Sequence, residues 1–362
     1  VGPRVAYAAL LGLRSLPEMG IGLSNSYESF LLFRLAIGEI GASFVITQYH
    51  TSVMFAPNVV GTANATAAGW GNLGGGVTQM VMPLVFAGFV GLGYTSAEAW
   101  RYSMVIPGVA LLGMAFVYYF FTQDTPEGNL RELRKRDPHY RAKAREATGS
   151  FRAACRDRRV WGLFLAYGAC FGVEITIDNI AALYFIDTFG LGIAQAGLLA
   201  GLFGLMNLFA RALGGIFGDK AGNRFGLPGR MVILGAFLLL EGLGIVLFSR
   251  MTLLPLAVAT MLLFALFVKM SNGATYSVVP FISPKALGSV SGIVGAGGNL
   301  GAVLAGFLFK SEAISYRDGL LYLGVGVALT AVLSLLLLNP FAARQRSRQA
   351  EPSLALAEQD VA

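Results

Sequence analysis

The sequence predicts an all-α polytopic membrane protein, and three observations lead to that prediction. Of the 362 residues, 55% are hydrophobic and 13% are charged, whereas soluble domains carry about 25% charged residues. The mean hydropathy is +0.64, and the apolar runs are continuous over about 20 residues, the length of a bilayer-spanning helix. The 47 glycines follow no strict period and 12% of residues are aromatic, which excludes collagen-like and disordered chains.

The apolar runs predict ten transmembrane helices. In chain order they lie at about 5–24, 28–55, 59–92, 100–122, 160–186, 190–217, 230–249, 253–278, 286–310 and 319–338. The second and third are long enough to tilt or to extend beyond the bilayer. Connections are short except at 123–158, so we expect an N-terminal bundle of four helices at 1–122 and a C-terminal bundle of six at 159–338.

Positive charge predicts which side of the membrane the connections occupy. Residues 131–159 hold 11 of the 27 lysines and arginines, and such basic loops lie in the cytoplasm. An even number of six helices separates this loop from the polar tail at 339–362, so we expect both to be cytoplasmic. Topology alone accounts for the basic loop, and we predict no nucleic-acid partner.

A short internal repeat predicts two related halves. Gly71-Asn72-Leu73-Gly74 recurs as Gly298-Asn299-Leu300-Gly301 at an offset of 227, and Arg4 has a looser counterpart in Arg230 at an offset of 226. Two agreeing offsets are typical of transporters built from structural repeats. A six-helix second half then predicts a six-helix first half, so the ten helices would be ten of an expected twelve, with two more preceding Val1.

Two polar residues within apolar helices are candidate site residues. Asn72 has small neighbours three and four positions away, an arrangement that recurs around Asn299; it is typical of close helix packing, and equally of a polar functional site. Inserting the charged Arg211 side chain at the bilayer centre would cost about 2.5–3.5 kcal/mol of free energy. Anion binding by its planar fork of N–H groups would explain it, and snorkelling toward the helix end is the alternative.

The predicted helix at 160–186 carries a face of aromatic and acidic residues. Tyr167, Phe171, Glu174 and Asp178 follow spacings of four, three and four, which place them on one side of a helix. Intramembrane carboxylates commonly relay protons, although Asp178 lies nearer the helix end and could simply be solvated. His50 and His139 stand far apart with no ligand cluster, and no nucleophile–base constellation is present, so we predict no metal, no cofactor and no enzyme activity.

Four segments resemble the nitrate/nitrite porter family of the major facilitator superfamily. They are Ala67–Gln79, with the string AAGWGNLGGGVTQ, and the segments Gly295–Gly301, Gly172–Asn179 and Asn207–Arg211. The likeness extends over essentially the whole chain to about residue 338. It implies a major facilitator fold, in which two six-helix bundles surround a central anion path.

The resemblance also implies roles for individual residues. Arg211 would grip the anion, with Asn72 and Asn299 as polar signature residues, Tyr167 as a hydrogen-bonding residue, and Phe44 and Phe171 as aromatic walls. The signature glycines would form close-packed or sliding surfaces: Gly69, Gly71, Gly74, Gly75, Gly76, Gly295, Gly297, Gly298 and Gly301. The family's second arginine would fall about 15 residues before Val1, by the offset of about 226 from Arg211.

The expected function is secondary active transport of nitrate across the cell membrane by alternating access in a monomer. Nitrite as a second substrate stays open. Glu174 and Asp178 resemble the acidic pair of proton-coupled importers, and we expect Glu174→Gln to abolish pH-driven uptake while leaving nitrate exchange. The alternatives are a nitrate/nitrite exchanger, another small-anion porter, or, from a different class, a non-transporting membrane sensor or scaffold.

Overall fold

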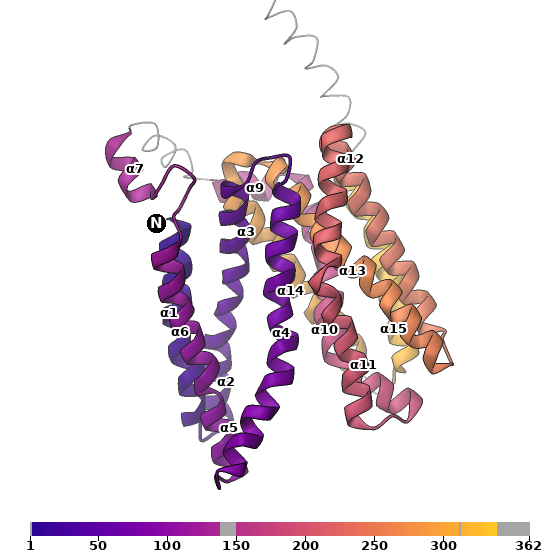
Figure 1. The fold of residues 1–362 in the computed structure, drawn as a ribbon. Coiled ribbons are helices and arrows are strands. Elements are labelled where there is room, and N and C mark those ends of the chain that lie inside the picture. The colour runs from indigo at the N-terminus through magenta and orange to yellow at the C-terminus, as the bar shows by residue number, and fades with distance from the viewer. Residues whose placement is uncertain (1, 138–149, 311–312, 339–362) are drawn as a thin grey trace, which may run out of the picture. The chain divides into compact units, whose positions relative to one another are not determined.

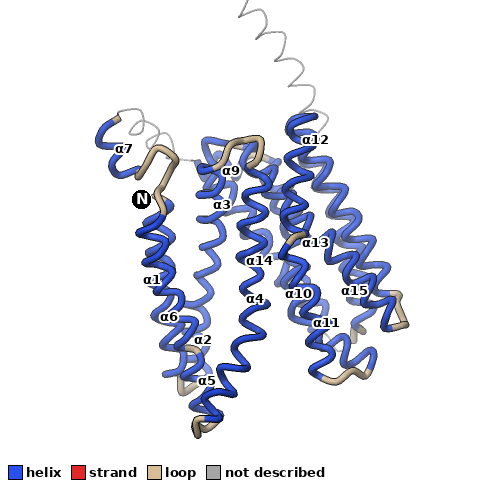
Figure 2. Tube along the Cα trace, viewed as in Figure 1, coloured by secondary structure: helices blue, strands red, loops and turns tan. Residues whose placement is uncertain are grey.

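The computed structural model describes residues 2–137, 150–310 and 313–338, which are helical nearly throughout (Figure 1, Figure 2). Within these ranges the one β-type pairing is an isolated bridge between Thr125 and Gly128. Seven of the described segments are long and apolar enough to cross a membrane. The all-helical membrane class predicted from the sequence is therefore confirmed, whereas the count of ten out of twelve stays a prediction. The predicted tail at 339–362 and residues 138–149 of the predicted loop lie outside the described residues.

The chain divides into two compact units, and the boundary falls inside one helix. Unit 1 comprises Val1–Met54 and Gly74–Thr148, and unit 2 comprises Phe55–Leu73 and Gly149–Ala362. Helix α4 (Val60–Gly91) contributes its first part to unit 2 and the rest to unit 1. The other elements of unit 1 are α1 (Pro3–Gly20), η1 (Ile21–Leu23), α2 (Tyr27–Gly38), η2 (Glu39–Gly41), α3 (Ala42–Met54), α5 (Ser96–Ser103), α6 (Val105–Phe121) and α7 (Leu130–Arg136).

In unit 1, polar contacts fasten the segment that follows α6. The buried Asp124 carboxylate accepts hydrogen bonds from the backbone N–H groups of Arg4 and Leu130, each at 3.0 Å. His50 on α3 contacts the Tyr118 hydroxyl through Nδ1 and the Gln123 carbonyl oxygen through Nε2, the latter at 2.7 Å. The start of α1, the end of α3 and the end of α6 are thereby held together.

Unit 2 is built from the long helices of the second half of the chain. They are α9 (Ser150–Arg156), α10 (Arg158–Phe189), α11 (Ile193–Leu205), η3 (Met206–Leu208), α12 (Ala210–Ser249), α13 (Leu254–Ile282), η4 (Pro284–Ala286), α14 (Leu287–Lys310) and α15 (Tyr316–Leu338). Helix α10 packs against α14 and α15, and α12 packs against α13 and α15 (Figure 1). Their shared core is apolar and rich in buried aromatic side chains.

The predicted helix boundaries are close to the observed ones, but two 3₁₀ interruptions inside predicted helices were not predicted. Short 3₁₀ turns at Glu39–Gly41 and Met206–Leu208 divide the predicted helices 28–55 and 190–217. Within α12, Gly226 has φ +66° and ψ −159°, so α12 is two helices joined at a sharp turn, which lies in the predicted connection between 190–217 and 230–249. An apolar run has the same hydropathy in an α-helix as in a 3₁₀ turn, and a periodicity argument therefore misses such breaks.

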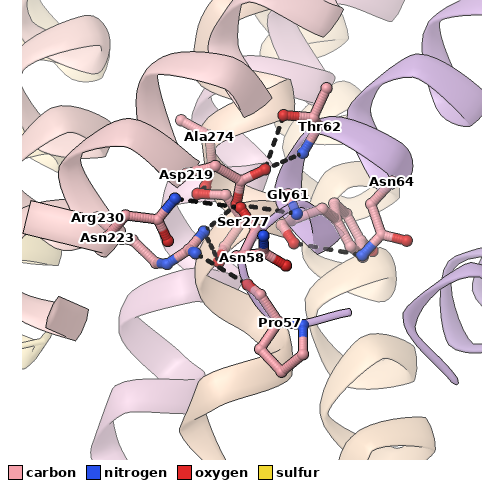
Figure 3. A network of polar contacts seen from close by, with 11 residues as sticks. Pro57, Asn58, Gly61, Thr62, Asn64, Asp219, Asn223, Arg230, Ala274 and Ser277 are labelled. Carbon is pink, nitrogen blue, oxygen red and sulfur yellow. Dashed lines mark hydrogen bonds and ion pairs between the residues drawn. The ribbon is translucent and has the colours of Figure 1, made fainter. Parts of the chain in front are cut away.

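A buried carboxylate ties the first turn of α4 to the turn in α12 (Figure 3). Asp219 accepts hydrogen bonds from the Gly61 and Thr62 backbone N–H groups, at 3.1 and 2.6 Å, and from the Thr62 hydroxyl at 2.7 Å. These N–H groups belong to the start of a helix, where they have no partner within the helix and favour negative charge. Arg230 forms an ion pair with Asp219 at 2.5 Å and also donates to the Pro57 carbonyl at 3.2 Å. This cluster positions the first half of α4 against α12.

Glycines allow α10 and α14 to approach backbone to backbone. A Cβ added at Gly172 would lie 2.6 Å from the carbonyl carbon of Gly301. A Cβ at Gly301 would collide with the carbonyl oxygen of Gly168, and one at Gly297 with that of Phe164. The signature glycines Gly297 and Gly301 thus lie at the tightest part of this helix pair.

We expect Gly301→Ala to lower the stability of the protein, because the new methyl group would separate α10 from α14. Overpacking of this kind costs about 1–3 kcal/mol. The matched control is Gly306→Ala on the same helix, where a Cβ would meet nothing within 4 Å. The measurement is the thermal midpoint of the purified protein in detergent, followed by size-exclusion chromatography. Equal midpoints for the two variants would contradict the close packing.

Candidate functional site

Glu174 is the centre of a buried polar cluster in unit 2. The residue is 2% exposed, and its carboxylate contacts five side chains contributed by α4, η3, α12 and α13. These are Asn72 Nδ2 at 3.3 Å, Asn207 Nδ2 at 2.8 Å, Asn272 Nδ2 at 2.7 Å, Lys269 Nζ at 2.9 Å and Arg211 Nη1 at 3.5 Å. Glu174 therefore joins four elements through one charged group.

The charges of this cluster do not cancel. Arg211 and Lys269 are each 0% exposed, and Glu174 lies within ion-pair distance of both. Two cations and one carboxylate sum to +1. A buried charge is costly unless it is paired, so the cluster favours a monovalent anion as a further partner. The three asparagine amides around Glu174 add neutral hydrogen-bond donors to the same region.

Two aromatic rings form a wall beside Arg211. The Arg211 Nη2 donates to the Tyr167 hydroxyl at 3.1 Å, and its guanidinium carbon lies 5.8 Å from the centre of the Phe171 ring. The Tyr167 and Phe171 rings are stacked at 5.0 Å with an interplanar angle of 6°. A Cβ at Gly298 would lie 2.7 Å from Phe171 and 2.8 Å from Tyr167, so this signature glycine leaves room for the stack.

The break between α11 and α12 places Asn207 and Arg211 in the cluster. Phe209, with φ −133° and ψ −34°, separates η3 from α12. A Cβ at Gly69 on α4 would lie 2.7 Å from the Asn207 carbonyl oxygen, and one at Gly214 would collide with the Met270 carbonyl oxygen. Small residues therefore let α4 and α13 approach the helix that carries Arg211.

The structure brings together five of the predicted site residues: Arg211, Asn72, Tyr167, Phe171 and Glu174. Asn299 is exposed and donates to the Gly295 carbonyl of its own helix at 3.3 Å. Asp178 is also exposed, one turn along α10 from Glu174. Phe44 lies on α3 in the other unit. The predicted roles of these last three residues stay predictions.

The remaining signature glycines differ in their surroundings. Among the described residues, a Cβ at Gly71 or Gly74 would meet nothing within 4 Å. Gly295 is buried in α14. Gly75 and Gly76 lie in α4, and their surroundings are outside the description.

Sequence reasoning missed Lys269 and Asn272. Both lie in α13: Lys269 is inside the apolar run Phe264–Met270, and Asn272 is the second residue after it. A lysine inside such a run carries the same insertion penalty as Arg211, and that penalty was the signal available in the sequence. Within the described part of the chain, no group of three or more His, Cys, Asp or Glu side chains could hold a metal ion.

Comparison with known proteins identifies the family. Residues 1–306 match the family model described as the Major Facilitator Superfamily. The chain is 42% identical over 329 residues to the "High affinity nitrate transporter 2.5" of Arabidopsis thaliana, covering 90% of this chain and 64% of that protein. It is 33% identical over 372 residues to the "High affinity nitrate transporter 2.7" of the same plant, covering 100% of this chain and 75% of the relative.

A solved structure agrees on the fold. The Escherichia coli fucose:proton symporter superposes with a TM-score of 0.64 at 14% identity, covering 92% of this chain and 83% of that one. The chain spans 64% of the length of its 42%-identical relative. It is a multi-pass membrane protein. The matched family model and these relatives establish that the chain belongs to the nitrate/nitrite porter family of the major facilitator superfamily.

Proposed function

We propose that the protein is a secondary transporter of nitrate that works by alternating access. The observation that carries this proposal is the buried cluster of Arg211, Lys269 and Glu174, whose charges sum to +1. A site of this charge in a low-dielectric interior favours one monovalent anion over a neutral molecule or a cation. The names of the relatives, which are nitrate transporters, support nitrate as that anion.

The side chains of the cluster suit a small planar anion. The Arg211 guanidinium offers a planar fork of donors to paired oxygens, and the stacked rings of Tyr167 and Phe171 supply a flat wall beside it. Nitrate would compete with the Glu174 carboxylate for Arg211 and Lys269. When the anion is absent, Glu174 holds the two cations in place. When the anion binds, Glu174 gives up part of its contacts with Arg211 and Lys269.

Proton-coupled uptake across the cell membrane is the mode we propose. Each charge moved through 100 mV is worth about 2.3 kcal/mol, so one anion moving toward a negative interior needs more than one proton to gain from the potential. Glu174 and Asp178 are the coupling residues that the sequence predicts. We further propose a monomer whose basic loop and C-terminal tail face the cytoplasm.

Nitrate uptake into proteoliposomes tests the proposal. The full chain is reconstituted, and uptake of isotopically labelled nitrate is measured with and without an inward proton gradient, against protein-free liposomes. We expect uptake above the protein-free level that rises with the gradient. Uptake that needs internal nitrite instead would identify an exchanger, and faster uptake of another small anion would identify a different porter. The absence of any anion flux would overturn the transport proposal and favour the sensor or scaffold.

A further inference from the structure

We propose that Glu241 is a proton-binding site that controls the anion affinity of the Arg211–Lys269–Glu174 cluster. This inference rests on the proposed function and deepens it, since it adds a buried acid outside the pair Glu174 and Asp178 as a site for the coupling proton. Glu241 lies on α12 and is 0% exposed.

Glu241 lies deep in its helix and is poorly supplied with donors. The second helix of α12 runs from the turn at Gly226 to Ser249, so at 1.5 Å per residue Glu241 stands roughly 22 Å from one end and roughly 12 Å from the other. Among the described residues, the Ser271 hydroxyl lies beside the carboxylate, but neither Oε1 nor Oε2 accepts a well-formed hydrogen bond. Both oxygens are shielded from solvent.

The polar and charged groups that face Glu241 come from two of the helices packed around it. Helix α13 contributes the Ser271 hydroxyl and the Lys269 charge, and α10 contributes Glu174 and the Cys170 thiol. Helix α15 packs on the adjacent Gly242 through Gly324 and Ala328, and its charged residues, Arg317 and Asp318, lie in its first turn. The nearby cation, Lys269, is already paired with Glu174 at 2.9 Å.

These surroundings favour a protonated, neutral Glu241. An ionised carboxylate in a dry site needs hydrogen bonds or a cation of its own, and without them it takes up a proton instead. Glu174 shows the opposite environment, with five polar side chains around its carboxylate. Two buried glutamates with such different surroundings can hold different protonation states at one pH.

Protonation of Glu241 then sets the charge that the anion meets. With Glu241 neutral, Arg211, Lys269 and Glu174 sum to +1. With Glu241 ionised, the four groups sum to zero, and Lys269 is drawn toward a second carboxylate. The anion therefore binds more tightly when Glu241 carries a proton. By the reciprocity of linked binding, the anion also strengthens proton binding at Glu241.

Nitrate binding to the purified full chain, measured as a function of pH, tests the proposal. As pH rises through the range in which Glu241 ionises, we expect wild-type affinity to fall by up to about tenfold per pH unit, with proton uptake from weakly buffered solution on nitrate addition. In Glu241→Gln, which keeps the shape of the neutral acid, affinity should stay high and independent of pH, without proton uptake. The matched control is Asp187→Asn, an exposed acid on α10, which should keep the wild-type pH dependence. Asp178→Asn is measured beside it as the competing coupling residue.

The possible failures are distinguishable. If the wild-type chain binds no nitrate at any pH, the proposed function itself falls, and this inference falls with it. If Glu241→Gln binds nitrate with the wild-type pH dependence, the inference is wrong and the function stands. A loss of pH dependence in Asp178→Asn alone would place the proton on Asp178 and overturn the role of Glu241. Proton uptake on nitrate addition is measured on the wild-type protein, so this test does not depend on the folding of a variant. The absence of proton uptake at every pH measured would also overturn the inference.

Discussion

Replacing Arg211 by lysine is expected to weaken nitrate binding by about 10- to 100-fold while leaving the protein folded. The lysine keeps a positive charge beside Glu174, so the buried carboxylate stays compensated. It loses the planar fork and the bond to the Tyr167 hydroxyl, which Arg211 makes at 3.1 Å. A hydrogen bond to a charged group contributes about 1.5–3 kcal/mol, and each 1.4 kcal/mol is about tenfold in affinity.

The measurement is nitrate affinity in detergent, together with the half-saturation of uptake in proteoliposomes. Arg224→Lys is the matched control, because Arg224 lies on the same helix and is exposed. The control should bind nitrate as the wild type does, and both variants should elute as single species on size-exclusion chromatography. Unchanged affinity in Arg211→Lys would mean that a point charge suffices, and the assignment of Arg211 as the anion-gripping residue would be wrong.

Helical periodicity accounts for the part of the site that could be predicted from the sequence. Tyr167, Phe171 and Glu174 lie on one face of a single helix, and Arg211 is conspicuous because a charge inside an apolar run needs an explanation. Contacts between helices far apart in the chain cannot be obtained in this way. Nothing in a single sequence pairs Lys269 with Glu174, although the lysine itself carries the same signal as Arg211.

The internal repeat predicted equal roles for Asn72 and Asn299, and their contacts differ. Asn72 donates to the Glu174 carboxylate, whereas Asn299 donates to a carbonyl of its own helix. A sequence repeat places the two asparagines at equivalent positions of two helices. The hydrogen-bond partner of each asparagine comes from a neighbouring element, and that element need not be repeated. The adjacent Gly298 has a clearer role, because its missing side chain admits the Tyr167–Phe171 stack.

Glu174→Gln is expected to destabilise the protein more than any other single change at this site. The carboxylate faces the amide nitrogens of Asn207 and Asn272 and two cations, all of them donors. A glutamine must turn its own NH₂ toward some of these donors, and it removes the carboxylate that lies within ion-pair distance of Arg211 and Lys269. Breaking a buried ion pair from one side costs about 3–5 kcal/mol.

This expectation differs from the simple loss of coupling that the sequence alone suggests for Glu174→Gln. With the glutamine in place, the cluster carries +2 instead of +1, so a bound anion should stabilise the variant more than it stabilises the wild type. The measurement is the thermal midpoint with and without nitrate. We expect a lowered midpoint in its absence and a larger upward shift on nitrate addition than in the wild type. A wild-type midpoint and shift would contradict the role of Glu174 as the counter-charge.

Removing one cation as well should restore much of the lost stability. In the double variant Glu174→Gln with Lys269→Met, the cluster returns to +1, and the methionine fills most of the volume of the lysine stem. The midpoint should therefore rise above that of Glu174→Gln, although Lys269→Met alone lowers the charge to zero and should weaken nitrate binding. Compared with the midpoint of Lys269→Met alone, a rescue larger than the sum of the two single effects is a coupling between two contacting residues. If the midpoint shifts of the two single variants simply added, Lys269 and Glu174 would not share one electrostatic site. The net charge of the cluster would then no longer support anion binding.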